Sequence, residues 1–121
     1  MNFIFDNDRP IYIQLMEYLK LGIINGKFPK GEKMPSVRDL ALETKVNPNT
    51  MQKALSELEE TGLVYSKKTS GRYVTEDEKV IKSLKDNIAN KKVDKYLEEM
   101  NKLGYCNKEA IKYLEKKGKI K

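Results

Sequence analysis

The fold is decided by residues 34–74, which read MPSVRDLALETKVNPNTMQKALSELEETGLVYSKKTSGRYV. Two sets of helix start signals lie inside this stretch. Ser36 suits the N-cap position, and Asp39 follows at the third helical position, as in a capping box. A second start has Asn47 as the cap and Pro48 at the first helical position. The sequence therefore predicts two short consecutive helices, the first ending near residue 43.

The second of these helices, expected over residues 47–61, has one apolar face. Its apolar residues recur at the i, i+3, i+4 and i+7 spacing of an amphipathic helix, namely Met51, Ala54, Leu55 and Leu58. Gly62 suits the position just after a helix end. The other faces carry Asn49, Thr50, Gln52, Lys53 and Ser56. We expect the apolar face to pack on a core and the polar faces to stay exposed.

A basic hairpin is predicted directly after this helix. Residues 63–65 and 72–74 are short strand candidates, and residues 69–71 form the expected turn. Between residues 61 and 75 the chain has Lys67, Lys68 and Arg72 and no acidic residue. Two helices and a basic hairpin are typical of a winged helix-turn-helix, whose second helix enters a DNA major groove. A structural edge hairpin, with lysines that oppose aggregation, is the alternative.

Further helices are expected on both sides of this stretch. Pro10 is predicted as the first residue of a helix that Gly26 stops after residue 25. After residue 75, apolar residues at helical spacing predict one long helix, or two in series, ended by Gly104, and Asn107 is expected to cap a last helix.

The expected fold is therefore mainly α with a small β-hairpin. It consists of a winged helix-turn-helix head over residues 1–75 and a short helical dimerisation tail over residues 76–121. The tail cannot bury its apolar stripes by itself, so the first helix of the head and the tail of a second copy are the expected partners. The predicted dimerisation residues are Ile81, Leu84, Ile88, Tyr96, Leu97, Met100, Leu103, Ile111 and Leu114.

Composition excludes several classes of function. The formal charge of +6 favours an anionic partner. With no histidine and one cysteine, Cys106, the chain lacks the residues for a zinc site, a disulfide or histidine catalysis, and we expect no metal or other cofactor. It also has no glycine-rich phosphate loop, so we expect no enzyme.

No stretch is apolar and long enough to approach a membrane span, and Asp6 and Asp8 interrupt any leader peptide. The cytoplasm is therefore the expected compartment.

The polar side of the second helix has the residue types that read DNA. Asn49 and Gln52 can each pair with adenine through two hydrogen bonds, which discriminates bases by about 1 to 3 kcal/mol per pair. Arg38, in the first turn of the preceding helix, can contact a phosphate or a guanine. These residues could instead be ordinary solvated side chains. The predicted DNA-binding residues are Ser36, Arg38, Asn47, Pro48, Asn49, Thr50, Gln52, Lys53, Lys67, Lys68, Thr69, Ser70, Gly71 and Arg72.

Several separated motifs resemble the winged-helix head of the GntR family of bacterial transcription regulators. They are PSVRDLA at residues 35–41, VNPNTMQKAL at residues 46–55 and GRYV at residues 71–74, in the family's order and spacing. The NPNT sequence of residues 47–50 and the short tail resemble the YtrA-type subgroup. This resemblance implies a homodimeric repressor joined through the tail and bound to a double-stranded DNA operator. It does not identify any small-molecule effector.

Four positions depart from the family pattern. Pro48 and Gln52 stand where many members have arginine, Thr69 stands where glycine is usual, and Arg72 stands where threonine is usual. The preferred DNA sequence need not be the family's commonest one. The alternative function is a winged-helix module that docks onto another protein without reading DNA, because the tail offers much apolar surface.

Overall fold

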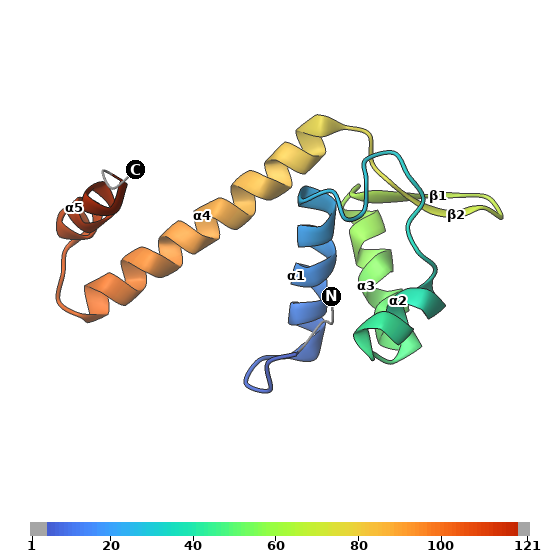
Figure 1. Cartoon of the computed structure of the whole chain (residues 1–121), viewed down its shortest axis with the longest axis horizontal. Helices are drawn as coiled ribbons and strands as arrows, with labels where there is room; N and C mark the ends of the chain where they lie inside the picture. The colour runs from blue at the N-terminus through green and yellow to red at the C-terminus, as the bar shows by residue number, and fades with distance from the viewer. Residues whose placement is uncertain (1–4, 119–121) are drawn as a thin grey trace. The chain divides into compact units, whose positions relative to one another are not determined.

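The computed structural model describes residues 5–118 (Figure 1). Their elements are α1 (Ile11–Ile24), α2 (Val37–Thr44), α3 (Pro48–Glu60), β1 (Val64–Lys67), β2 (Gly71–Val74), α4 (Glu78–Lys102) and α5 (Asn107–Gly118). A mainly helical fold with a hairpin after two short helices was predicted, and it is confirmed. The chain divides into two compact units, one ending at Leu84 and one beginning at Lys85. Within residues 5–118 no helix is both long and apolar enough to span a bilayer.

The head is built around one apolar core to which α1, α2, α3 and the hairpin all contribute. The three helices lie beside one another, and the hairpin extends from the carboxy-terminal end of α3 (Figure 1). The predicted apolar face of α3 is buried as expected. Each large apolar side chain buried in this way contributes about 1.5 to 3 kcal/mol. The least exposed core side chains include Leu15, Leu19, Leu40, Met51, Leu55, Leu58, Val64 and Val74.

The two helix start signals act as predicted. The Ser36 hydroxyl accepts the backbone N–H of Asp39 at 3.0 Å and caps α2. The Asn47 side chain accepts the backbone N–H of Asn49 at 2.7 Å and caps α3. Between the two helices Lys45 adopts a left-handed conformation, with φ of 58°, which lets the chain turn sharply. The caps and this turn fix the helix-turn-helix.

The end of α3 follows a regular stop motif. The N–H of Gly62 donates to the carbonyl of Glu59, and the N–H of Leu63 donates to that of Leu58. This is the Schellman arrangement, which needs a left-handed residue, and Gly62 has φ of 82°. The motif turns the chain directly into β1, so the place of the hairpin relative to α3 is set locally.

Two predicted helix starts are wrong by one residue. Pro10 precedes α1 as an extended N-cap with ψ of 133°, because its ring restricts φ but leaves ψ free. Asn107 does not cap α5 but is its first residue. The cap is Cys106, whose N–H donates to the Glu109 carboxylate at 3.0 Å and whose carbonyl accepts from Ala110. The Asn107 side chain instead accepts a hydrogen bond from an α4 residue.

The hairpin is longer and better supported than predicted. Val64 pairs with Val74 and Lys67 pairs with Gly71, so Gly71 belongs to β2 and not to the turn. The free edge of β2 pairs with the segment that precedes α2, through a bridge between Lys33 and Tyr73. Two flanking backbone hydrogen bonds of 2.8 and 2.9 Å extend this pairing. The segment leading into α2 is therefore anchored to the wing.

A polar cluster joins α1 to α2 at the surface. The Tyr18 hydroxyl donates to the Glu43 carboxylate at 2.9 Å, and Lys27 donates to the same carboxylate at 3.3 Å. The Lys27 ammonium also lies 4.6 Å from the centre of the Tyr18 ring. The pKa of Glu43 is held below its ordinary value, chiefly by the hydrogen bond from Tyr18. The cluster keeps the first helix of the motif against α1.

The residues after the wing form one helix, α4, and not two in series. Its first turns belong to the head, because Val80, Ile81 and Leu84 pack against the head core. Within the second unit, the Tyr96 hydroxyl donates to the carbonyl of Ala110 at 2.7 Å. Ala110 is fully buried. These two residues join α4 to α5.

Gly22 provides a stability test because a Cβ there would lie 2.4 Å from the buried Phe28 ring. Replacing a helical glycine by alanine usually raises the free energy of unfolding by about 0.5 to 1 kcal/mol. We expect Gly22→Ala instead to lower the free energy of unfolding by about 1 to 3 kcal/mol through overpacking. Urea unfolding followed by circular dichroism measures it. The control is Gly118→Ala, since nothing lies within 4 Å of that position. Equal stability of the two variants would contradict the expected clash.

Candidate nucleic-acid interface

The exposed side of α3 differs between its two halves. Its amino-terminal half has no acidic residue in the first turn and exposes Asn49, Gln52 and Lys53, whereas Thr50 is half-buried. All its acidic residues, Glu57, Glu59 and Glu60, lie in the carboxy-terminal half. Phosphates repel carboxylates and are attracted to helix amino termini. Only the first two turns of α3 are therefore suited to approach DNA.

Lys53 lies on the α1 side of this surface. Its ammonium is 5.3 Å from the centre of the Tyr12 ring, and the Tyr12 hydroxyl donates to Glu57 at 3.0 Å. Burial raises the pKa of Tyr12, and the hydrogen bond to Glu57 adds to this effect. The lysine remains exposed, so the ring orients its side chain and leaves the charge at the surface.

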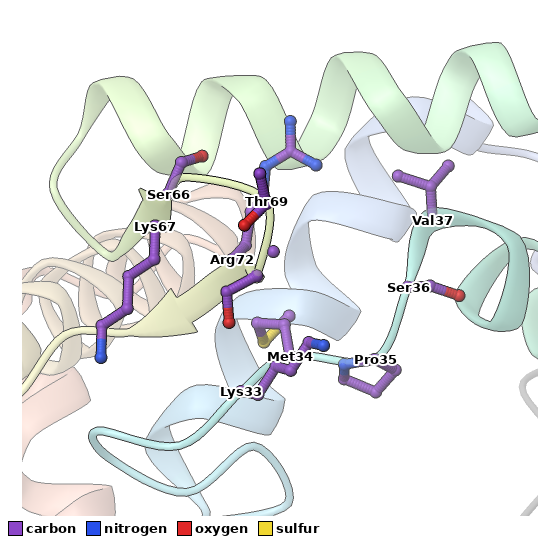
Figure 2. A pocket seen from close by; sticks show the side chains of 11 residues that line it. Lys33, Met34, Pro35, Ser36, Val37, Ser66, Lys67, Thr69 and Arg72 are labelled. Carbon is purple, nitrogen blue, oxygen red and sulfur yellow. The ribbon is translucent and has the colours of Figure 1, made fainter.

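The segment before α2 and the wing enclose a groove of about 510 Å³. Six predicted DNA-binding residues line it: Ser36, Lys67, Thr69, Ser70, Gly71 and Arg72. Figure 2 shows Lys33, Met34 and Pro35 along one side and Ser66, Lys67 and Arg72 along the wing. The α2 cap and the wing, which are far apart in sequence, thus share one surface. Arg38 is also exposed, in the first turn of α2.

Lys33 belongs to this surface although sequence analysis did not select it. The Lys33 side chain lies over Gly71, since a Cβ on Gly71 would come within 3.0 Å of its Cε. Gly71 has φ of 112°, a backbone conformation that favours glycine. The Lys33–Tyr73 bridge brings this lysine to the groove. Lys33 and Tyr73 are far apart in sequence, so no local pattern predicts their pairing. The one available sequence signal was that Lys33 is a basic residue close to the start of α2.

The wing cations lie in three different environments. Lys67 covers the Tyr73 ring, with its ammonium 4.3 Å from the ring centre, and Tyr73 stacks on Tyr65 at 5.9 Å. Lys68 is exposed in the turn. Arg72 was expected to contact DNA along the backbone or in the minor groove. In the structure its Nε donates to Glu59 of α3 at 3.1 Å, and its side chain is only 18% exposed. Figure 2 shows this side chain pointing toward α3.

Together these features define a winged helix-turn-helix of the DNA-binding class: a helix pair, a polar second helix and a hairpin with cations beside the groove. The chain belongs to the family described as bacterial regulatory proteins, gntR family, which matches residues 11–74. The family consists of transcriptional regulators, so the chain is a DNA-binding regulator and not an enzyme. Family membership favours DNA reading over docking onto a protein alone. Among the described residues no cluster of histidine, cysteine or acidic side chains could hold a metal ion.

Two curated proteins of Bacillus subtilis are similar to this chain. The uncharacterised regulator YhcF is 32% identical over 107 residues, which is 88% of each chain. The transcriptional repressor YtrA is 40% identical over 70 residues, which are 58% of this chain and 54% of the repressor. The match to YhcF therefore includes most of the tail, whereas the match to YtrA covers about half of that protein.

Solved structures extend these similarities. A GntR family transcriptional regulator from Listeria monocytogenes is 39% identical with a TM-score of 0.83, covering 93% of this chain and 98% of that one. The DNA-binding domain of AraR in complex with operator ORX1 is 28% identical with a TM-score of 0.52. That comparison covers 62% of this chain and 92% of the domain. A DNA-binding domain similar to this head is thus known bound to operator DNA.

The wing turn contains a strained residue whose relief can be measured. Thr69 has φ of 59°, although a β-branched residue in the left-handed region is unfavourable by about 1 to 2 kcal/mol. We expect Thr69→Gly to raise the free energy of unfolding by up to about 1 kcal/mol, because the greater freedom of glycine in the unfolded chain offsets part of the gain. Urea unfolding measures this. The control Lys68→Gly, in the same turn without a positive φ, should lower stability. A loss in both variants would show that Thr69 is not strained.

Proposed function

We propose that this chain is a dimeric repressor that binds a pseudo-palindromic DNA operator through α3 and the wing. The observation that carries the proposal is the acid-free amino-terminal half of α3, which stays exposed while the opposite face is buried. Two similarities support it: the related YtrA is a repressor, and the AraR domain is bound to an operator. A symmetric dimer would place half-sites about 34 to 36 Å apart, or at multiples of this spacing.

Base reading is assigned to Asn49 and Gln52. They lie three residues apart near the start of α3, so their side chains project from neighbouring positions of the exposed face. Each amide can donate and accept one hydrogen bond at the major-groove edge of adenine. Asn47, Pro48 and Thr50 adjoin them at the helix start and would contact the sugar-phosphate chain or a thymine methyl group.

Phosphate contacts are assigned to the cations around this face. Lys53 lies on the α1 side of the exposed face, Arg38 lies in the first turn of α2, and Lys67 and Lys68 lie on the wing. Such contacts fix the register of a protein on the duplex and carry no sequence information. The amino terminus of α2, capped by Ser36, adds favourable backbone dipoles for a phosphate.

Dimerisation is assigned to the tail. Leu103, Ile111 and Leu114 are 72%, 48% and 50% exposed, although all three are large and apolar. Tail residues of the predicted set that are half-buried are Ile88, Tyr96, Leu97 and Met100. Exposed apolar side chains on α5 and in the turn that precedes it favour a protein partner. Since Ile81 and Leu84 already pack on the head core, we assign the interface to the residues from Ile88 onward.

The assignment of base and phosphate contacts can be tested by two contrasting substitutions. Asn49→Ala should weaken binding to the preferred duplex by about 1 to 3 kcal/mol and relax preference at one base pair. Lys68→Ala should weaken binding to all duplexes alike and reduce the salt slope by about 1. Fluorescence anisotropy on a duplex enriched from a random pool, and on a scrambled one, measures both effects.

The control for this experiment is Lys91→Ala, at an exposed lysine of α4 outside the head. It should leave base preference and the salt slope unchanged. Equal losses on enriched and scrambled duplexes for Asn49→Ala would contradict base reading by α3.

The proposed interface can be tested with the double substitution Ile111→Glu and Leu114→Glu. Charges on this exposed apolar face should abolish the dimer, because burying two unpaired carboxylates is strongly unfavourable. Size-exclusion chromatography with light scattering measures the mass. Affinity for a duplex with two half-sites should fall much more than affinity for one half-site. Lys112→Glu, at an exposed position between them, is the matched control and should stay dimeric. A dimeric double variant would rule out this interface.

A further inference from the structure

The Glu59 carboxylate joins the recognition helix to the wing. Its Oε1 accepts a hydrogen bond from Arg72 Nε at 3.1 Å and another from the Ser66 hydroxyl at 2.9 Å. Ser66 and Arg72 face each other across the hairpin, one on β1 and one on β2. One oxygen atom on α3 therefore holds both strands of the wing.

This arrangement leaves Arg72 little freedom to reach DNA. Its side chain is 18% exposed, and the Glu59 side chain is 37% exposed. Withdrawing the guanidinium to contact a phosphate would leave the Glu59 carboxylate without its cation beside a polyanion. Lys68, by contrast, is exposed in the turn, and Lys67 is oriented by the Tyr73 ring. The phosphate-facing charge of the wing is therefore assigned to its lysines.

We propose that Glu59 and Arg72 are positioning residues that fix the wing relative to α3, and that Arg72 is not a phosphate contact. The proposal rests on the function proposed above and deepens it. Glu59 lies on α3, which carries the side chains assigned to base reading. Arg72 lies on the hairpin, which carries Lys67 and Lys68. Holding the hairpin to α3 sets the separation between base reading and phosphate contact.

Arg72 could hold the wing in position or contact a phosphate, and these two roles predict opposite effects of Glu59→Gln on DNA affinity. If Glu59 positions the wing, its loss weakens DNA binding. If Glu59 merely competes with a phosphate for Arg72, its loss frees a cation and removes an anion, so binding tightens. Glu60→Gln is the matched control, because Glu60 is the next residue of α3 and its substitution removes the same charge without touching the wing.

The experiment compares the full-length protein and the variants Glu59→Gln, Arg72→Gln, both together, and Glu60→Gln. Anisotropy titrations use the duplex enriched from a random pool and a scrambled duplex, each at several salt concentrations. We expect Glu59→Gln to bind about three- to fivefold more weakly than Glu60→Gln, and Arg72→Gln to bind about three- to fivefold more weakly than the unmodified protein. The double variant should bind no more weakly than either single one. Neither single variant should reduce the salt slope by the unit that loss of a phosphate contact gives. Thermal melting establishes that each variant is folded.

Binding by Glu59→Gln that equals or exceeds that of Glu60→Gln would overturn the proposal, as would additive losses in the double variant. If a single variant fails to fold, the exchange Glu59→Arg with Arg72→Glu replaces it. Affinity recovered relative to Arg72→Glu alone supports positioning, and no recovery opposes it. Absence of DNA binding by the unmodified protein would instead refute the proposed function, so the two failures are distinguishable.

Discussion

The burial of one face of α3 is the constraint on which the rest of the head depends. Met51, Leu55 and Leu58 are at most 1% exposed in a core shared with α1, α2 and the hairpin. A helix that buries one stripe must turn its opposite side to solvent. The exposure of Asn49 and Gln52 is therefore a consequence of core packing, and the same hydrophobic contacts that stabilise the head also orient the side chains that we propose read DNA.

Charge is distributed along α3 in a way that matches this orientation. The first turns carry amides, a hydroxyl and one lysine, while the carboxylates lie near the far end. Two of those carboxylates form hydrogen bonds to neighbouring elements. Glu57 accepts one from Tyr12 of α1, and Glu59 accepts two from the hairpin. The end of α3 that is unsuited to phosphates serves instead to attach the helix to its neighbours. One helix thus carries the side chains proposed for base reading at its start and the side chains for structural attachment near its end.

Local signals were predicted well because their physics involves few neighbouring residues. The Ser36 and Asn47 caps and the Gly62 stop each depend on hydrogen bonds within about one helical turn, and all three lie where expected. The errors at Pro10 and Asn107 come from the same source, since two adjacent residues could each begin a helix. In the second case Glu109 decided the cap by bonding to Cys106. Gly71 was predicted in the turn but belongs to β2. Strand length depends on pairing with the partner strand, which the local sequence does not specify.

The sequence by itself determined the order of elements, the helix-turn-helix and the polar face of α3, because apolar periodicity and caps act over short separations. Its motifs also indicated the family, which the match over residues 11–74 establishes. Only the tertiary structure decided that Lys33 lies on Gly71 and that Arg72 is bound to Glu59. Both are pairings between residues distant along the chain. Their partners are set by how the hairpin packs against α3 and the segment before α2, which no local pattern encodes.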